Sequence, residues 1–368
     1  MDKKKQMSIF VIGTRGIPDI QGGVERHCEN MYPYLSEYYN ITIFRRKPYV
    51  RDHLKIWHNI RFIDLTSTKI KGFETVFHSL LTSLVCIVRR PDIVHVHNIG
   101  PGMFTPLLRL FGLKVVITYH SPNYEHAKWN RWQKMILRFS EYCALKFANK
   151  LIFVSRVQYR KFSSKYAYKA VWIPNGVKSP VFSISTDYIH SLGLTEEKYI
   201  LSVGRITQEK GFDYLIEAYK QMKDNDFRLV IAGGEDHHSA YSKQIVKQAH
   251  DNHVILTGFI TGEPLYQLYS HAGLFVLPSY NEGHPIALLE AMNYNIPVIV
   301  SDIPANKEIG LDDEVYFQTG NVGELTIKMH QQIAALPRKK QYEMSQYNWE
   351  IIANQTVDVY HRLFANTV

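Results

Sequence analysis

Residues 280–302 read YNEGHPIALLEAMNYNIPVIVSD, with one apolar run, 272–277, just before them and another, 297–300, near their end. Between the runs, apolar residues at 286, 289, 291 and 292 recur at roughly helical spacing. Pro285 suits the first helical position, where no amide hydrogen is needed. The stretch therefore predicts a strand, a tight loop, a helix and a second strand, which together form one right-handed βαβ crossover.

The loop of this crossover would lie beyond the carboxyl end of its first strand, where open α/β sheets bind ligands. The helix start offers the amides of Ile286 and Ala287 and the positive end of a dipole, a combination that favours phosphate. Glu282 in the loop and Glu290 in the helix would instead accept hydrogen bonds from hydroxyls, such as those of a ribose and a sugar. The alternative is that both glutamates are ordinary solvated surface residues.

Glu282 and Glu290, with GHPIALLEAM between and after them, resemble the E-x7-E motif of retaining GT-B glycosyltransferases of the family-4 type. The resemblance covers nearly the whole chain and is strongest over residues 199–310. It implies an α/β fold of two Rossmann-like parallel-sheet domains facing a cleft, with a nucleoside diphosphate sugar held mainly by the second domain. The donor-binding residues implied in that domain are Arg205, Lys210, Gly258, Phe259, Glu282, Gly283, Pro285, Ile286, Ala287 and Glu290.

The length and composition suit a globular protein with two cores. A chain of 368 residues is long enough for two domains. No stretch approaches the roughly 18–20 apolar residues that a membrane-spanning helix needs, and the start, MDKKKQMSIFVIG, predicts a first strand rather than a signal peptide. The three cysteines show no metal-binding or pairing pattern, so we expect a cytoplasmic protein.

The charge is unevenly distributed along the chain. Residues 1–175 carry 28 Lys and Arg against 11 Asp and Glu, a net charge of +17, whereas residues 176–368 carry 15 against 23, a net charge of −8. The asymmetry predicts that the first half meets an anion, such as nucleic acid, an acidic membrane surface or a lipid-diphosphate acceptor. A basic surface that meets only solvent is the alternative. Nucleic acid is disfavoured because no reading motif is recognisable and the second half is acidic.

A glycine-containing loop follows the first predicted strand, residues 8–12, and leads into a helix over about 24–38. The loop, GTRGIPDIQGGVE, lacks the G-x-G-x-x-G spacing of dinucleotide-binding folds. It resembles the first loop of these glycosyltransferases, especially a bacterial subgroup that includes rhamnosyltransferases. The resemblance implies that Gly22 and Gly23 face the donor diphosphate or the acceptor, and Arg15 would add a fixed positive charge toward the acceptor. A tight turn without a ligand is the alternative.

Two further predicted strands end just before His97 and His120. The position of His120 resembles that of a histidine that, in this superfamily, contacts the donor sugar near its anomeric centre. His97, together with Glu125 and His126 in the next loop, could face the acceptor. A purely structural role is the alternative for each histidine.

Residues 128–150, KWNRWQKMILRFSEYCALKFANK, predict a basic amphipathic helix. Its apolar stripe comprises Trp132, Met135, Ile136, Phe139, Tyr142 and Leu145, and its basic side comprises Lys128, Arg131, Lys134 and Arg138. Such a stripe is more often part of a core. The alternative is that the helix lies on an anionic membrane, which would make the protein peripheral on the inner face of the cell membrane.

The phrase IPNGV, residues 173–177, resembles the interdomain crossover of GT-B enzymes. We therefore expect a first domain over 1–175, completed by a helix at about 350–368, and a second domain over 176–349. In the second domain, VGRITQEKGFDYLIEA looks like the donor-phosphate motif of the family. Arg205 and Lys210 bracket its loop, and a planar guanidinium with a compact ammonium suits a diphosphate.

These features lead to a mechanistic expectation in which His120, Glu282, Arg205 and Lys210 are catalytic. The two cations would stabilise charge on the departing diphosphate in place of a divalent metal, for which no Asp-x-Asp lies in a suitable loop, so we expect neither metal nor cofactor. The family implies retention, and transfer of a sugar, such as rhamnose, to a lipid-diphosphate-linked or polysaccharide acceptor in bacterial surface polysaccharide synthesis. A nucleotide-sugar epimerase on the same scaffold and a basic nucleic-acid-binding protein are the alternatives. The sugar, the nucleotide and the linkage stay open.

Overall fold

The computed structural model describes residues 6–68, 73–125, 129–222, 226–235, 239–335 and 339–365. The chain divides into two compact units, which we call the amino-terminal unit (Met1–Gly176 with Tyr347–Val368) and the carboxyl-terminal unit (Val177–Gln346). Gly176 and residues 347–349 thus lie in the first unit, not in the second as expected. The reason is local packing, because Trp349 is buried in the first core and a Cβ on Gly176 would lie 2.7 Å from its ring.

The amino-terminal unit is built on a sheet whose hydrogen-bonded neighbours follow the order β3-β4-β2-β1-β5-β6-β7-β8. β3 pairs antiparallel with β4, and the other neighbours pair in parallel. The order reverses between β1 and β5, the position where sheets of this kind bind ligands. The strands are β1 (Ser8–Ile12), β2 (Asn40–Arg46), β3 (Ile56–Trp57), β4 (Ile60–Leu65), β5 (Ile93–His97), β6 (Val115–Tyr119), β7 (Lys150–Phe153) and β8 (Ala170–Trp172).

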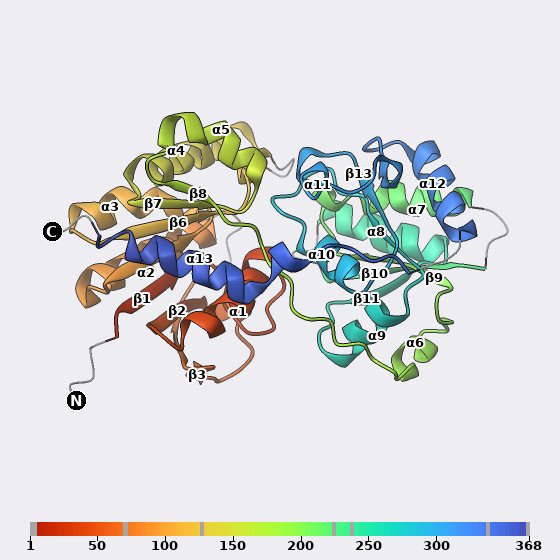
Figure 1. Cartoon of the computed structure of the whole chain (residues 1–368), viewed down its shortest axis with the longest axis horizontal. Helices are drawn as coiled ribbons and strands as arrows, with labels where there is room; N and C mark the ends of the chain where they lie inside the picture. The colour runs from red at the N-terminus through yellow and green to blue at the C-terminus, as the bar shows by residue number, and fades with distance from the viewer. Residues whose placement is uncertain are drawn as a thin grey trace. The chain divides into compact units, whose positions relative to one another are not determined.

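Helices cover both faces of this sheet. Successive residues of a strand point to opposite faces, so Ile9 and Val11 join the core under α1 and α13, whereas Ile12 joins the core under α2 to α5. Figure 1 shows α13, in blue, running beside α1, in red. The helices are α1 (Gly23–Leu35), α2 (Phe73–Arg89), α3 (Thr105–Leu110), α4 (Arg131–Phe147), α5 (Arg156–Tyr166) and α13 (Trp349–His361).

Helix α13 belongs to the amino-terminal core although it follows the whole carboxyl-terminal unit in sequence. The Asn348 side chain accepts a hydrogen bond from the Glu350 amide, which satisfies one of the unpaired amides at the helix start. Its buried residues recur at helical spacing and form one face: Trp349, Ile352, Ala353, Thr356, Val359 and Tyr360. That face completes the core against α1.

The carboxyl-terminal unit is a second parallel sheet, with the order β11-β10-β9-β12-β13-β14. Numbered within the unit, this is the 3-2-1-4-5-6 order of doubly wound nucleotide-binding sheets, and it reverses between β9 and β12. The strands are β9 (Tyr199–Val203), β10 (Arg228–Ala232), β11 (Ile255–Gly258), β12 (Leu274–Leu277), β13 (Val298–Ser301) and β14 (Tyr316–Phe317). The helices are α6 (Asp187–Ser191), α7 (Phe212–Gln221), α8 (Ala240–Asp251), α9 (Glu263–His271), α10 (Ile286–Asn293), α11 (Pro304–Lys307) and α12 (Val322–Ala334).

The crossover predicted from residues 280–302 is β12, α10 and β13. The two strands pair in parallel, with Phe275 opposite Val298, so the predicted parallel α/β architecture is confirmed. The helix begins at Ile286, and Pro285 is the residue before it rather than its first residue. The shift of one residue leaves the Ile286 and Ala287 amides at the helix start, as expected.

The apolar stripe of helix α4 was expected to be part of the core, but most of it is exposed. Trp132, Met135, Ile136, Phe139 and Tyr142 are exposed, and only Leu145 of the stripe is buried. The buried side of α4 instead carries the small residues Ser140, Cys143 and Ala144. A close approach explains this, because a Cβ on Gly102 would lie 2.6 Å from Ala144 Cβ. None of the helices in the described ranges is long and apolar enough to cross a bilayer.

Candidate functional site

In the carboxyl-terminal unit, the loops after β9 and β12 meet at the point where the strand order reverses. The Tyr280 amide donates a hydrogen bond of 2.8 Å to the Glu209 carbonyl, which joins the two loops. Gly211 has φ +66°, and a Cβ there would lie 2.2 Å from the Pro278 carbonyl oxygen. Only glycine fits this contact, so the sequence holds the two loops in one arrangement.

Lys210 and Glu282, one from each loop, form an ion pair. Lys210 Nζ lies 2.6 Å from Glu282 Oε1, and the same carboxylate oxygen accepts a 2.6 Å hydrogen bond from Ser279 Oγ. The Lys210 stem packs over Gly204, where an added Cβ would lie 3.3 Å from Lys210 Cδ. The two charged side chains are only 16% and 11% exposed. Two residues that the sequence assigned to one donor site are thus in contact.

The start of α10 lies next to this ion pair in sequence, with Gly283 and Pro285 between Glu282 and the helix. The first amides of a helix have no partner within it, so those of Ile286 and Ala287 point away from the helix. Glu290, in the second turn, accepts a 2.9 Å hydrogen bond from the Tyr269 hydroxyl. This contact orients one oxygen of the carboxylate.

The remaining predicted donor residues of this unit are on the loops beside it. Arg205 follows β9 and is half-buried. Gly258 ends β11 with φ +70°, and the next residue, Phe259, has 45% of its surface exposed. Gly233, after β10, packs so tightly that a Cβ would lie 1.9 Å from the Gly204 carbonyl oxygen. The loops after the neighbouring strands β9, β10 and β11 therefore form one continuous edge of the sheet.

In the amino-terminal unit, the loop after β1 approaches the end of β5. Gly13 has φ +100°, and a Cβ there would lie 2.1 Å from the His97 carbonyl oxygen. Glu25 Oε1 accepts a 2.9 Å hydrogen bond from the Arg15 amide, and a Cβ on Gly22 would collide with Glu25 Oε2. Around Gly23, in contrast, an added Cβ would meet nothing within 4 Å. Gly22 therefore serves the packing of its own loop, and Gly23 borders open space.

The other predicted acceptor residues are dispersed. The Arg15 guanidinium lies over the Tyr49 ring, 4.8 Å from its centroid. Glu125 is exposed in a short 3-10 turn, Asn123–Glu125. His126 lies outside the described residues. The structure therefore groups neither Arg15 nor Glu125 with His97.

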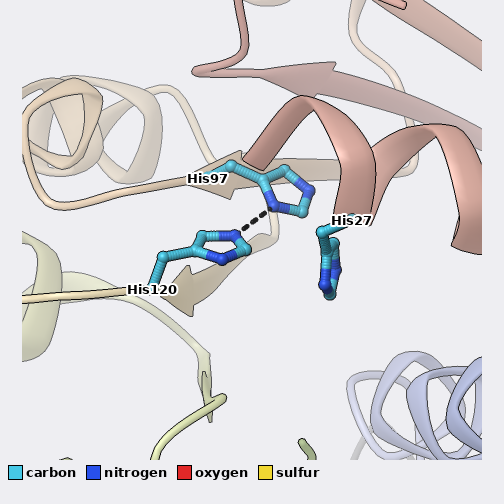
Figure 2. Close-up of side chains that lie close together, drawn as sticks. All are labelled: His27, His97 and His120. Atoms are coloured by element: carbon cyan, nitrogen blue, oxygen red, sulfur yellow. Dashed lines mark hydrogen bonds between the residues drawn. The ribbon is translucent and has the colours of Figure 1, made fainter. Parts of the chain in front are cut away.

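A buried cluster of histidines lies at the carboxyl ends of β5 and β6. His97 is the last residue of β5, His120 follows β6, and His27 projects from α1 (Figure 2). His97 Nδ1 lies 3.0 Å from His120 Nε2, and the rings of His27 and His120 are 4.9 Å apart at their centroids. His27 Nδ1 donates a 2.8 Å hydrogen bond to Asn175 Oδ1, and its Nε2 is buried without a hydrogen-bond partner among the described residues.

Behind His97 the cluster continues as a hydrogen-bonded chain. The Tyr32 hydroxyl lies 2.7 Å from His97 Nε2 and 2.9 Å from His95 Nδ1, which is also 2.6 Å from the Tyr360 hydroxyl. His95 Nε2 bonds to Thr118 Oγ1 at 2.7 Å. Both nitrogens of His95 are thus engaged in hydrogen bonds, which fixes the ring between the strands and α13.

Burial keeps these histidines neutral. It lowers the pKa of His27 to about 4 and that of His95 to about 3, from an ordinary 6.5. Burial, with smaller effects of the neighbouring histidines, holds the pKa of His97 and of His120 well below the usual range. Each imidazole at neutral pH therefore has one N–H donor and one lone pair.

The sequence had singled out only His97 and His120 in this cluster. His95 is two residues before His97 on a strand, so the two side chains lie on the same face, a signal that was available. The positions of His27 and Tyr360 depend on how α1 and α13 pack on the sheet. Local spacing carries no information on that packing.

Two family descriptions match the chain, one on each half. Residues 21–179 match "Glycosyltransferase Family 4" and residues 186–347 match "Glycosyl transferases group 1". The chain belongs to the glycosyltransferases. The rhamnosyltransferase-like subgroup and the retaining class, which the first loop and the E-x7-E motif suggested, remain predictions.

Relatives among curated proteins agree with this assignment. An uncharacterised glycosyltransferase of Methanocaldococcus jannaschii is 33% identical over 209 residues, an alignment that covers 51% of this chain and 53% of that protein. This chain thus spans about half the length of that relative. The amylovoran biosynthesis glycosyltransferase AmsD of Erwinia amylovora is 22% identical over 89% of this chain and 91% of its own length.

Solved structures show the same fold. The sucrose-phosphate synthase of Thermosynechococcus elongatus has a TM-score of 0.82 at 22% identity, over 98% of this chain and 99% of that protein. HepE of Anabaena, solved in complex with UDP-glucose, has a TM-score of 0.73 at 17% identity, over 97% and 98% of the two chains. The fold of this glycosyltransferase is therefore GT-B, as the sequence predicted.

Proposed function

We propose that this glycosyltransferase moves a sugar from a nucleoside diphosphate sugar to a lipid-linked or polysaccharide acceptor, with retention and without a metal. The observation that supports it most strongly is the Lys210–Glu282 pair at the reversal point of the carboxyl-terminal sheet. A cation and a carboxylate at one such point match the two ends of this donor. The ammonium suits the diphosphate and the carboxylate suits sugar hydroxyls.

In the proposed reaction, breaking the anomeric bond leaves negative charge on the diphosphate. Lys210 and Arg205, with the amides of Ile286 and Ala287 at the start of α10, would stabilise that charge in the transition state. Donor binding would exchange the Lys210–Glu282 contact for contacts of each side chain with the donor. Because both residues are held by their loops, little further ordering would be needed.

His120 and the two glutamates would position the sugar and the ribose. Burial keeps the His120 ring neutral, so it can hydrogen-bond a sugar hydroxyl without adding positive charge beside an electron-poor anomeric carbon. Glu282 would accept hydrogen bonds from sugar hydroxyls, and Glu290, oriented by Tyr269, would accept hydrogen bonds from the ribose. For retention we propose a same-face displacement aided by the leaving phosphate.

The proposals for the acceptor and the sugar come from the names of similar proteins and from the first loop. AmsD is, by its name, a glycosyltransferase of amylovoran biosynthesis, and HepE was solved with UDP-glucose. These names favour a polysaccharide pathway and a nucleotide-sugar donor. Rhamnose is favoured only by the likeness of the loop that contains Gly22 and Gly23 to rhamnosyltransferases.

We also propose that α4 rests on an anionic lipid surface. The helix exposes Trp132, Met135, Ile136, Phe139 and Tyr142, although a soluble helix normally buries such a stripe. Arg131, Lys134 and Arg138 lie on the same helix, and residues 1–175 carry a net charge of +17. Apolar side chains combined with basic ones are typical of interfacial helices, and an acceptor in the membrane would be brought close to the enzyme.

Calorimetric titration of UDP, dTDP and GDP in EDTA tests the donor site. We expect micromolar binding of one nucleotide, weakened at least about tenfold in Arg205→Ala. The control is Lys340→Ala, which removes a cation from an exposed ion pair. Lys340 Nζ lies 2.6 Å from Asp312 Oδ2, the same distance as in the Lys210–Glu282 pair. Equal binding by Arg205→Ala and wild type would remove Arg205 from the site. A new sugar formed from donor alone would indicate an epimerase.

A further inference from the structure

The proposed transfer reaction uses only His120 of the histidine cluster in the amino-terminal unit and gives no role to the grouping of His27, His97 and His120. One ligand-capable atom from each of His27, His97 and His120 lies within 4.8 Å of the other two. The side chains come from α1, β5 and the segment after β6, and Figure 2 shows the three rings converging on one region. We propose that these three histidines form a binding site for a borderline-soft divalent cation such as Zn²⁺.

The hydrogen bonds around the cluster leave suitable lone pairs. His27 donates from Nδ1 to Asn175, so its Nε2 carries a lone pair, and that atom is buried without a hydrogen-bond partner among the described residues. His97 Nε2 faces the Tyr32 hydroxyl, which leaves Nδ1 for the cluster. Histidines that bind metals characteristically donate their second N–H to an oxygen in this way.

The nearby His95, in contrast, has no ring nitrogen left to bind a cation. It stacks on His97 with ring centroids 4.5 Å apart, but its two nitrogens are occupied by tyrosine and threonine hydroxyls. His95 is therefore a structural histidine. Within the described part of this cluster, the buried ring nitrogen without a hydrogen-bond partner is Nε2 of His27, whose ring lies next to those of His97 and His120.

Coordination would require only a small contraction of the cluster. Zinc binds imidazole nitrogens at about 2.0–2.1 Å, which places nitrogens of a tetrahedral site about 3.3 Å apart. His97 Nδ1 and His120 Nε2 already lie 3.0 Å apart, and one proton separates them. A cation would take the place of that proton, which would move to Nδ1 of His120. His120 is the most exposed of the three, so a cation and a fourth ligand would reach the cluster from its side.

A bound cation would also change the proposed reaction, and this consequence rests on the role of His120 proposed above. Coordination through Nε2 of His120 would leave its Nδ1 as a hydrogen-bond donor only and would place positive charge near the sugar. We therefore expect activity to survive EDTA and to fall on addition of Zn²⁺. The cation would act as an inhibitor and not as a catalytic partner of the diphosphate.

Cobalt binding to the full chain tests the site independently of catalysis. Co²⁺ in a nitrogen-rich tetrahedral site absorbs strongly in the visible region, and we expect one such ion per chain, displaced by Zn²⁺. His27→Gln and His120→Gln should each lose the bands. Tyr32→Phe, which removes the hydroxyl that contacts His97 and His95, should weaken binding by about tenfold or more. His250→Gln, at an exposed histidine, is the matched control and should keep the spectrum.

Unfolding curves without metal establish that each variant is folded. Unchanged cobalt bands in folded His27→Gln and His120→Gln would overturn the proposal, as would the absence of a tetrahedral spectrum in the wild-type protein. Failure of the transfer reaction with intact cobalt binding would count against the proposed function and leave the metal site standing.

Discussion

Lys210 and Glu282 are 72 residues apart in the chain, and their side chains meet at 2.6 Å. The contact holds both side chains in place where the loops after β9 and β12 meet. Neither residue supports the core, since both lie on loops and retain some exposure. Their contribution is therefore to binding and catalysis more than to folding.

Removal of either charge should leave a folded enzyme with little activity. We expect Lys210→Ala and Glu282→Ala each to lower turnover by about 10²-fold or more, because each removes a preorganised contact to the reacting donor. Lys340→Ala, which breaks the exposed pair with Asp312, should leave turnover unchanged. Steady-state rates with sugar donors that carry the nucleotide identified by calorimetry provide the measurement. A folded variant with normal turnover would exclude that residue from the mechanism.

The buried histidines should make stability depend on pH. The folded-state pKa of His27, about 4, lies below its ordinary 6.5, so the unfolded chain binds more protons between these values. The free energy of unfolding should therefore be highest above pH 6.5 and decrease as the pH falls toward 4. Protonation of His27 in the unfolded chain should by itself lower the free energy of unfolding by about 1 kcal/mol between pH 7.5 and 5.5.

Urea unfolding at these two pH values checks the expectation. His27→Gln should show a smaller loss than the wild type, because one titrating group is gone. His250→Gln, with an exposed ring, should behave as the wild type does. A wild-type free energy of unfolding that is the same at both values would contradict the prediction.

At this scale the sequence identified side chains but not their partners. Glu282, Arg205 and Lys210 could be nominated because each lies near a strand end or a helix start, which local patterns predict, and Glu290 because it completes the spacing that resembles E-x7-E. That Ser279 and Lys210 share one oxygen of Glu282 could not be inferred, since it depends on the pairing of β9 with β12.

Among the elements, α4 is the helix whose buried face differs from the face that its sequence pattern predicts. Its stripe of large apolar residues has the spacing of a core helix, yet the helix packs through Ser140, Cys143 and Ala144. The close approach of Gly102 to Ala144 requires small side chains at the contact. Amphipathicity indicates which residues share a face, but it does not say which face meets the protein.

The exposed face of α4 should carry membrane binding. We expect the protein to cosediment with anionic vesicles and to be released by high salt, because screening weakens the attraction of Arg131, Lys134 and Arg138 to the lipid. The double variant Trp132→Ser with Phe139→Ser should lose binding even at low salt, since it removes inserted apolar area.

A helix surface of the second unit supplies the control. Ile327 on α12 is also exposed, and Ile327→Ser should leave vesicle binding unchanged. Equal binding to neutral and anionic vesicles would contradict the proposal that α4 rests on an anionic lipid surface. Binding that survives the double change on α4 would contradict it too.

Over the whole molecule, the GT-B architecture could be predicted because its βαβ units are local. The stretch at 280–302 and the loops at 13–25 and 203–218 each mark a strand, a turn and a helix. The boundary at 347–349 was placed less well, since it depends on the packing of Trp349 against Gly176. Helices α8, α9 and α12 were not identified in advance.

The amino-terminal unit should depend on α13 for its stability. Ile352 is fully buried and its neighbour Ile351 is 46% exposed. Ile352→Ala should cost about 2–5 kcal/mol, because it opens a cavity in the core shared with α1, whereas Ile351→Ala should change stability by about 0.5 kcal/mol or less. Denaturant unfolding of the two variants gives the comparison, and equal losses would show that α13 does not support this core.

The position of α13 also has a consequence for how the chain is made. A ribosome adds residues 349–361 only after it has translated all of 177–346. During that interval the sheet face that carries Ile9 and Val11 lacks part of its cover, while the later unit is contiguous and can complete its own core. The earlier of the two units in the sequence is therefore the one that completes its core last. A nascent chain of this protein therefore leaves apolar surface of the first core uncovered while residues 177–346 are being made.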